Sequence, residues 1–368
     1  MWSGTFGRLG TMLHLFWKNG KYDLWLFWII TGPVYIIFTR FFMRMDSIFY
    51  PQLKDVEIKN PVFIMGHPRS GTTFFQKRVH ESGKVSMFTT WEIALPSILQ
   101  RKLFGPIVQL FKMFEMRVLR PARKGHEVRI DGVEEDEGIF LHRLDSEMVT
   151  VFCPWLLIDE EYRDLGMRLG WNDKSQNRNS LIFYRETLRR QIFHSGKKQV
   201  VAKFNPSILR LENILKVFPD ARIVYIVRSP KDTLRSFFTF TYKLVHDYLS
   251  KDELETFFER KYQWSVQLYQ YFEEVKKQIP RERLMVVRFS DLTDNLPATM
   301  QDFFEFIHIS PGVEYWNAIY ELANDSHDKK HKNDSVESFG MSAERIENDL
   351  QFVYDRYLEE EKSTSENN

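Results

Sequence analysis

Short apolar runs alternate with amphipathic stretches along the chain from residue 60 onward. Strands buried on both faces of a parallel sheet are short and continuously apolar, and such runs occupy residues 61–65, 199–203, 222–227 and 284–289. The intervening stretches have the spacing or the end signals of helices, at residues 72–81, 205–218, 230–249 and 253–278. This alternation predicts βαβ units and an α/β fold, a three-layer α/β/α arrangement around a central, mostly parallel sheet.

Two of the predicted helices begin with the same local signal. Asn205-Pro206 and Ser229-Pro230 each place a capping residue before a proline. A proline is well tolerated at the first helical position, and the preceding side chain can accept a hydrogen bond from the first turn. We therefore expect both helices to start at these pairs.

A hydrophobic segment precedes the α/β pattern. Residues 24–39 (LWLFWIITGPVYIIFT) contain no charge, but a bilayer span needs about 20 apolar residues, and Gly32-Pro33 interrupts the run. Trp25, Trp28 and Tyr35 suit a membrane interface. A signal peptide is not expected, because the run starts late and no small-residue cleavage site follows. We expect attachment at a membrane surface; a helix packed on the globular domain and a true span are the alternatives.

These patterns divide the chain of 368 residues into three parts. Residues 1–55 form a hydrophobic N-terminal helical segment that associates with a membrane. Residues 56–358 form one large α/β domain, which is possible at this length. Residues 359–368 are polar and are expected to be disordered.

Composition narrows the choice of partners and compartment. Lysine and arginine number 51 and the acidic residues 50, so charge gives no argument for a nucleic-acid partner. The single cysteine, Cys153, excludes a disulfide within the chain and favours a reducing, cytoplasmic location. It is expected to be a buried small hydrophobe. Aromatic residues make up 15% of the chain, mainly for the core, with an apolar substrate site as the alternative.

Residues 66–73 (GHPRSGTT) follow a predicted strand and open a predicted helix. Their spacing is that of the phosphate-binding loop G-x-x-x-x-G-K-[ST], except that Thr72 replaces the lysine. The glycines, the converging amides and the helix N-terminus still favour an anion, and Arg69 supplies a cation. Without the lysine that meets β- and γ-phosphates, the loop is expected to hold a single 5′-phosphate.

A second phosphate site is predicted from Arg228 and Ser236. Arg228 directly follows the run at 222–227, and Ser236 lies two turns into the following helix. Both therefore approach the carboxyl edge of the sheet, where α/β folds bind ligands, and an arginine with a hydroxyl suits a phosphate. Together the two sites describe a ligand with two separate phosphates.

At these motifs the sequence resembles the sulfotransferases. Residues 67–76 (HPRSGTTFFQ) look like their 5′-phosphosulfate loop, and residues 223–238 (IVYIVRSPKDTLRSFF) look like their 3′-phosphate segment. The similarity covers roughly residues 60–345. It is greatest to a bacterial-type branch with the motifs GHPRSGTT, TTWE, EEDE and VFPDAR, here at 66–73, 89–92, 134–137 and 217–222.

The resemblance implies a reaction and a set of binding residues. The co-substrate would be 3′-phosphoadenosine 5′-phosphosulfate (PAPS), and the sulfonate would pass to a hydroxyl of a small-molecule or lipid-like, apolar acceptor, with no metal. The residues implied for the 5′-phosphate are Arg69, Ser70, Gly71, Thr72 and Thr73. Those implied for the 3′-phosphate are Arg228 and Ser236.

Catalytic roles are also implied. Glu92 in TTWE stands where family members with a glutamate base carry it; a structural acid in the first turn of a helix is the other reading. The run Glu134, Glu135, Asp136, Glu137 is a rival location for the base, although a charge run is usually a solvated face. Lys203 is expected to touch the sulfonyl or bridging oxygen, unless it is a surface lysine, and Arg69 reaches the same region.

Two other functions are weighed. A P-loop kinase or nucleotide hydrolase would need a lysine at position 72, which is absent. A non-catalytic nucleotide-binding or lipid-binding peripheral membrane protein would be expected to lose the base or one phosphate site. Arg69, Glu92, Arg228 and Ser236 are all present.

Overall fold

The computed structural model describes residues 4–113, 117–119, 128–171, 176–324 and 335–358. The predicted tail, residues 359–368, lies outside these ranges. The chain forms two compact units. Unit 1 comprises Met1–Pro61, Val85–Ala202 and Glu212–Asp220, and unit 2 comprises Val62–Lys84, Lys203–Leu211 and Ala221–Asn368.

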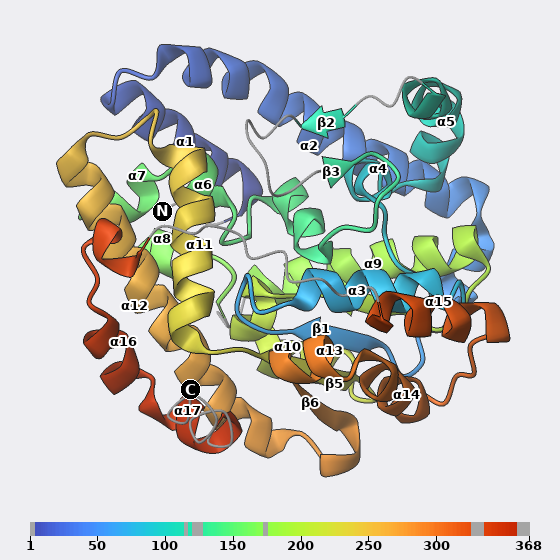
Figure 1. Ribbon diagram of the computed structural model, residues 1–368. Helices are drawn as coiled ribbons and strands as arrows, with labels where there is room; N and C mark the ends of the chain where they lie inside the picture. Colours follow the sequence, from blue (N-terminus) through green and yellow to red (C-terminus); the bar gives the residue numbers. More distant parts are fainter. Residues whose placement is uncertain (1–3, 114–116, 120–127, 172–175, 325–334, 359–368) are drawn as a thin grey trace. The chain divides into compact units, whose positions relative to one another are not determined.

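Unit 2 is built on the predicted sheet. Its strands are β1 (Val62–Met65), β4 (Val201–Lys203, by which the chain enters the unit), β5 (Arg222–Val227) and β6 (Leu284–Arg288), in the order β4-β1-β5-β6 (Figure 1). β1 pairs with β5 and β5 with β6, both in parallel. Every residue of β1 is buried, which explains why the strand has no polar alternation. The mostly parallel sheet is therefore confirmed.

Helices flank this sheet. Those of unit 2 are α3 (Thr72–Glu81), α11 (Pro230–Val245), α12 (Lys251–Val275), α13 (Phe289–Asp294), α14 (Leu296–Phe306), α15 (Val313–Asn324), α16 (Ala343–Asp349) and α17 (Gln351–Tyr357), with short 3₁₀ turns at Pro206–Arg210, Lys276–Gln278, Arg281–Arg283 and Val336–Phe339. α12 stacks on β5, since the rings of Tyr225 and Phe272 lie 3.6 Å apart. α3 meets α14 through Phe75 and Phe303.

The helix predicted at 205–218 is divided, and both predicted helix starts are confirmed, but neither capping side chain makes the expected hydrogen bond. A 3₁₀ turn, Pro206–Arg210, precedes α10 (Leu211–Val217). Asn205 occupies the N-cap position, but its side chain makes no capping hydrogen bond, and its Nδ2 donates to Thr72 Oγ1 at 2.9 Å. Pro230 does open α11, but the Ser229 side chain makes no capping hydrogen bond. α11 also ends at Val245, short of the predicted 249.

Unit 1 is mainly helical. Its elements are α1 (Thr5–Lys18), α2 (Tyr22–Phe49), η1 (Pro51–Asp55), α4 (Thr90–Ala94), α5 (Ile98–Met113), the antiparallel pair β2 (Arg117–Leu119) and β3 (Val128–Arg129), η2 (Asp136–Arg143), α6 (Val149–Phe152), α7 (Trp155–Ile158), α8 (Arg163–Met167), α9 (Gln176–Ser195) and most of α10. Cys153 is fully buried beside α6, as expected of a small hydrophobe, and burial raises the pKa of its thiol.

Helix α2 runs without a break through Gly32-Pro33, so the predicted interruption is wrong. Gly32 is instead a point of close approach to α1, where an added Cβ would lie 2.9 Å from Leu9 Cδ1. The helix also continues well beyond residue 39, because its later polar residues find partners in unit 1. Arg40 donates to Thr5 Oγ1 at 2.8 Å, and Asp46 is fully buried against Arg190.

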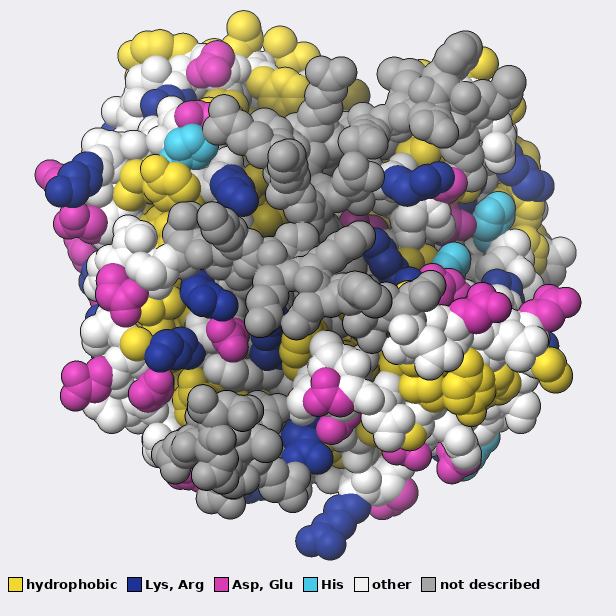
Figure 2. Space-filling view, in the orientation of Figure 1, with side chains coloured by type: hydrophobic (Ala, Val, Ile, Leu, Met, Phe, Trp, Pro, Cys, Tyr) yellow, Lys and Arg dark blue, Asp and Glu magenta, His cyan; other side chains and the backbone are white. Residues whose placement is uncertain are grey.

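The outward side of α2 is apolar. Between Asp23 and Arg44 the exposed residues are Leu26, Phe27, Ile29, Ile30, Val34, Tyr35, Ile37 and Phe41. All of them except Tyr35, whose ring stacks on the buried His142, are called the apolar face of α2. Hydrophobic side chains line the upper edge in Figure 2, along which α2 runs in Figure 1. The helix is long and apolar enough to span a bilayer, with a mean hydropathy of 1.6 over 18 residues, and only 22% of that window is buried.

Candidate functional site

The loop between β1 and α3 has the backbone of an anion cradle. Gly71 adopts a left-handed conformation with φ 104° at the N-terminus of α3. A Cβ at Gly71 would lie 2.5 Å from the Phe289 ring, and one at Gly66 would lie 2.5 Å from the carbonyl oxygen of Ile226. Arg69 also has a positive φ, 78°. These tight turns lead directly into the N-terminus of α3, which is the positive end of that helix.

Two hydroxyl groups of the loop, those of Thr72 and Thr73, accept hydrogen bonds from residues near the end of β4. Asn205 Nδ2 donates to Thr72 Oγ1 at 2.9 Å, and Lys203 Nζ donates to Thr73 Oγ1 at 2.7 Å. Lys203 is only 3% exposed, so the surface-lysine alternative is wrong, and it lies against the loop. Ser70 Oγ is buried, and none of the described residues gives it a hydrogen bond.

The two predicted phosphate sites meet at Arg69. Its Nε donates to Ser236 Oγ on α11 at 3.2 Å, and its guanidinium lies 5.5 Å from the Phe240 ring centroid. Arg228, which follows β5, stacks on the Phe289 ring at 4.4 Å. The loop and the helix after β5 therefore contribute to one basic region at the carboxyl edge of the sheet, although the sequence predicts Arg69 and the pair Arg228 and Ser236 as two separate sites.

The electrostatics of this region favour an anion. Burial lowers the pKa of Arg69, and the positive charge of Arg228 lowers it further. Burial also lowers the pKa of Arg228, partly offset by Asp232. No hydrogen bond or ion pair to the Arg228 guanidinium comes from the described residues. A phosphate oxygen would relieve both the desolvation and the repulsion between the two cations.

Glu92 lies in α4, in unit 1, and is 8% exposed. Its Oε2 accepts hydrogen bonds from Thr89 N and Thr89 Oγ1, each at 2.8 Å, and from Gln191 Nε2 at 3.3 Å. The contacts with Thr89 form a capping box. Glu92 is therefore a structural acid in the first turn of α4, which was the alternative to its role as the base. Its Oε1 lies 3.7 Å from Arg101 NH1 and 3.9 Å from His194 Nε2. The two oxygens of Glu92 therefore differ in their surroundings: Oε2 accepts the three hydrogen bonds, and Oε1 lies near the Arg101 guanidinium and the His194 ring.

The rival acidic run is not a solvated face. Asp136 and Glu137 are 1% and 0% exposed, and Asp136 accepts a hydrogen bond from Tyr184 at 2.8 Å. The segment lies beside α4, because Glu134 N donates to the carbonyl of Phe88 and Thr89 pairs with Val133. The expectation of solvation fails because the partner, Tyr184, is remote in sequence.

Three residues of the loop region are missed by the sequence patterns. Asn205 holds Thr72, Phe289 packs against Gly71 and stacks on Arg228, and His67 is fully buried with Nδ1 2.8 Å from the carbonyl oxygen of Pro68. Burial lowers the pKa of His67 to about 4. Asn205 lies two residues after the end of β4, and this position near the carboxyl edge of the sheet is a signal in the sequence for its contact with the loop.

Comparison with known proteins decides the family. The sequence profile of the sulfotransferase family matches residues 61–311, more than half of the chain and both phosphate motifs. The chain belongs to the sulfotransferase family. Its members are transferase enzymes, and the predicted resemblance is confirmed.

Two curated relatives of this sulfotransferase family member are similar over part of the chain. They are the omega-hydroxy-beta-dihydromenaquinone-9 sulfotransferases Stf3 of Mycobacterium bovis and Mycobacterium tuberculosis, each 28% identical over 175 residues. The alignment covers 46% of this chain and 42% of each relative. The chain therefore matches less than half the length of these sulfotransferases.

Solved sulfotransferase structures share the fold. The crystal structure of STF9 from Mycobacterium avium has a TM-score of 0.70 at 16% identity and covers 86% of this chain and 81% of that one. STF1 from Mycobacterium tuberculosis H37Rv has a TM-score of 0.68 at 17% identity, covering 93% and 90%. The parallel sheet with flanking helices is thus the fold of this family.

Proposed function

We propose that the protein transfers the sulfonate of PAPS to a hydroxyl of an apolar or lipid-like acceptor and releases adenosine 3′,5′-bisphosphate. The observation that carries this is the pair of half-buried arginines Arg69 and Arg228, which lie on two different motifs, with Ser236 hydrogen-bonded to Arg69. Two cations that approach each other without an ion pair to Arg228 from the described residues suit a ligand with two phosphates.

The binding residues fit the co-substrate. The loop amides, with Ser70, Thr72 and Thr73, would hold the 5′-phosphate, and Arg228 with Ser236 would hold the 3′-phosphate. Lys203 and Arg69 would meet negative charge on the transferring sulfonate and on the bridging oxygen. These residues supply the anion contacts without a metal ion.

Glu92 is the proposed general base. As the acceptor oxygen forms its bond to sulfur, the bond between sulfur and the 5′-phosphate oxygen breaks, and the hydroxyl proton passes to Glu92. Oε1 is the oxygen suited to this, because Oε2 already accepts three hydrogen bonds. The buried acidic run at 134–137 stays the alternative location of the base.

We further propose that residues 1–55 attach the catalytic domain, residues 56–358, to the cytoplasmic surface of a membrane. The apolar face of α2, which includes the aromatic residues Phe27 and Phe41, suits insertion into the headgroup region. A full span is disfavoured, because Arg40, Thr39 and Asp46 on the opposite side bond to residues of unit 1. The helix would therefore lie in the plane of the membrane.

An apolar acceptor follows from this attachment. A helix lying at the membrane surface would bring the enzyme to hydroxyl groups of lipid-soluble molecules. The names of the curated relatives specify a hydroxylated menaquinone, which is itself a lipid. The proposed membrane attachment and the names of these relatives both support a lipid-like alcohol as the acceptor.

Calorimetric titration with adenosine 3′,5′-bisphosphate in EDTA tests the proposal, with AMP as the matched ligand that lacks the 3′-phosphate. We expect the bisphosphate to bind at least ten times more tightly than AMP, without magnesium. Equal affinity for both, or no binding of either, would remove the two-phosphate site. Preference for ATP with magnesium would favour a kinase or hydrolase instead.

A further inference from the structure

The helix that carries Glu92 is too short to satisfy its own carbonyl groups. α4 has five residues, Thr90–Ala94, and the last four carbonyls of any helix lack partners within it. Here the carbonyl oxygens of residues 92–95 all accept side-chain hydrogen bonds. Arg101 donates to Glu92 and Leu95 at 3.2 and 2.9 Å, and His142 and Tyr35 approach Ile93 and Ala94 at 2.8 and 3.4 Å.

Arg101 fixes both the backbone and the carboxylate of Glu92. Besides the two carbonyls, its NH1 donates to Gln191 Oε1 at 2.6 Å and lies 3.7 Å from Glu92 Oε1. Gln191 in turn donates to Glu92 Oε2 and to the carbonyl of Met87. Burial lowers the pKa of Arg101 to about 10, against the raising effect of Glu92 and Asp46, so the guanidinium stays charged at neutral pH.

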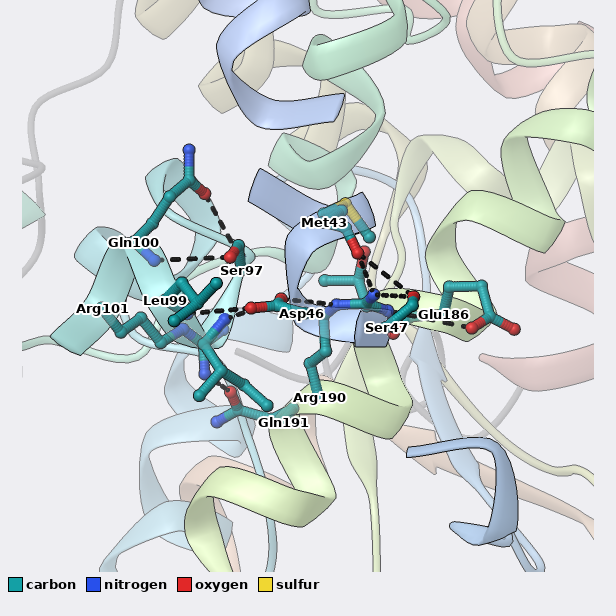
Figure 3. A network of polar contacts seen from close by, with 12 residues as sticks. Met43, Asp46, Ser47, Ser97, Leu99, Gln100, Arg101, Glu186, Arg190 and Gln191 are labelled. Atoms are coloured by element: carbon teal, nitrogen blue, oxygen red, sulfur yellow. Dashed lines mark hydrogen bonds and ion pairs between the residues drawn. The ribbon is translucent and has the colours of Figure 1, made fainter. Parts of the chain in front are cut away.

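Helix α2 holds Arg101 in place through Asp46 (Figure 3). Asp46 is fully buried and accepts hydrogen bonds from the amides of Ile98 and Leu99 at 3.0 and 2.9 Å, which are the first residues of α5. It also pairs with Arg190 Nε at 2.9 Å. A carboxylate at a helix N-terminus is stabilising, and this one fixes the turn of α5 that carries Arg101.

A second link from α2 passes through His142. The Tyr35 and His142 rings stack with centroids 4.5 Å apart, and Thr39 Oγ1 lies 3.2 Å from His142 Nδ1. Burial lowers the pKa of His142 to about 4, so the ring is neutral at pH 7. The consistent tautomer carries its proton on Nε2, which donates to the carbonyl of Ile93, while Nδ1 accepts from Thr39.

We infer that α2 positions the base: Asp46 and Thr39 act through Arg101 and His142, and Tyr35 acts directly, to hold α4 and with it the Glu92 carboxylate. The inference rests on the proposed role of Glu92. The two sides of α2 then have separate tasks. The apolar face binds the membrane, and the inward side chains hold the catalytic helix. Arg101, His142, Tyr35, Thr39 and Asp46 are positioning residues, because they act through Glu92.

Double-mutant cycles test this with PAPS and decanol as the acceptor. We expect Arg101→Lys to lower kcat by roughly 10–100-fold, because a small displacement of a reacting group reduces the rate by a factor of this size. The Kd for adenosine 3′,5′-bisphosphate should not change. In the Glu92→Gln background, Arg101→Lys should cost nothing further. A full additional loss would overturn the inference, because Arg101 would then act independently of Glu92. Arg189→Lys on α9 is the matched control.

A measurement without an acceptor separates this inference from the proposed function. Thr89 N donates to Glu92 Oε2, so hydrogen exchange at the Thr89 amide reports the position of the carboxylate. Arg101→Lys and Asp46→Asn should speed this exchange at least tenfold, and Tyr35→Phe less, whereas Tyr22→Phe on the same helix should not. Unchanged exchange would refute the inference, even if Glu92→Gln abolishes turnover. Faster exchange together with full activity of Glu92→Gln would refute only the role of Glu92 as the base.

Discussion

Arg69 donates from Nε to Ser236 Oγ at 3.2 Å, although the two residues are 167 positions apart in the chain. Arg69 belongs to the loop after β1, and Ser236 belongs to the helix after β5. Since β1 and β5 are paired in parallel, their carboxyl ends meet at one edge of the sheet. One hydrogen bond therefore joins the two motifs that were predicted separately as phosphate sites.

Arg228→Ala should weaken binding of adenosine 3′,5′-bisphosphate by about 1.5–3 kcal/mol, the range for hydrogen bonds to charged groups. Binding of AMP should change much less, because AMP has no 3′-phosphate. Calorimetry with both ligands checks this. The control is Arg235→Ala, since Arg235 is already paired with Asp232 at 2.9 Å. Equal losses for the two ligands would show that Arg228 does not contact the 3′-phosphate.

Glu92→Gln should lower turnover by roughly 10²–10⁴-fold while leaving nucleotide binding nearly intact, because general acid–base groups contribute rate factors of this size. Glutamine can still accept the hydrogen bond from Thr89 N, so the cap of α4 is retained. Steady-state rates and calorimetry on the same sample provide the check. The comparison variant is Glu135→Gln in the acidic run. If that variant loses turnover and Glu92→Gln does not, the base lies in the run.

Stability should fall as the pH drops below 6.5, because His67 and His142 are buried and neutral. Their pKa values are lowered to about 4, whereas an unfolded histidine has a pKa of about 6.5. Between these values the unfolded chain binds more protons, so the free energy of unfolding decreases with falling pH. From pH 7.0 to pH 5.5 the two residues together should cost about 2.5 kcal/mol.

Denaturant unfolding at several pH values measures this slope. His67→Gln should flatten it by about half, and His14→Gln, at an exposed position on α1, should leave it unchanged. The informative quantity is the change with pH, because His67→Gln can lower stability at every pH. An unaltered slope in this variant would mean that His67 is protonated in the folded protein near its ordinary pKa.

Ile30→Ser combined with Ile37→Ser should weaken binding to lipid vesicles by at least about 10-fold. Both side chains are 58% exposed on the apolar face of α2, and burying an isoleucine in an apolar medium is worth about 1.5–3 kcal/mol. Co-sedimentation with vesicles checks this. Val313→Ser on α15, which is 76% exposed, is the control. No change in the double variant would argue that this face is not the membrane-binding surface.

The parts of the fold predicted best are those fixed by local pattern. The bounds of α3 and β5 match the predicted residues, and β1 and β6 each differ by one residue at one end, because short apolar runs and a glycine loop leave few alternatives. The predictions that were wrong concern side chains with distant partners. The Asn205 side chain bonds to Thr72 and makes no capping hydrogen bond, and Gly32 packs on Leu9 and does not interrupt its helix.

In the candidate site, too, the residues placed by local pattern were predicted and the contacts between distant residues were not. The positions of Arg228 and Ser236 after a predicted strand place both at the carboxyl edge of the sheet, since parallel topology determines which strand ends meet. The hydrogen bond from Arg69 to Ser236 was not predicted. Burial of Asp136 could not be predicted, because Tyr184 comes from another helix. The contacts by which Arg101 and Asp46 support Glu92 could not be predicted from the sequence either, because no local sequence pattern relates the three positions.

The Phe289 ring contacts both proposed phosphate sites, the loop at Gly71 and the Arg228 guanidinium. One side of its ring leaves no space for a Cβ at Gly71, and the ring also lies 4.4 Å from the Arg228 guanidinium. An aromatic ring is incompressible, so it limits how closely the loop and Arg228 can approach each other. Under the proposed function, a nucleotide whose second phosphate is attached elsewhere on the ribose is therefore expected to reach only one of the two sites.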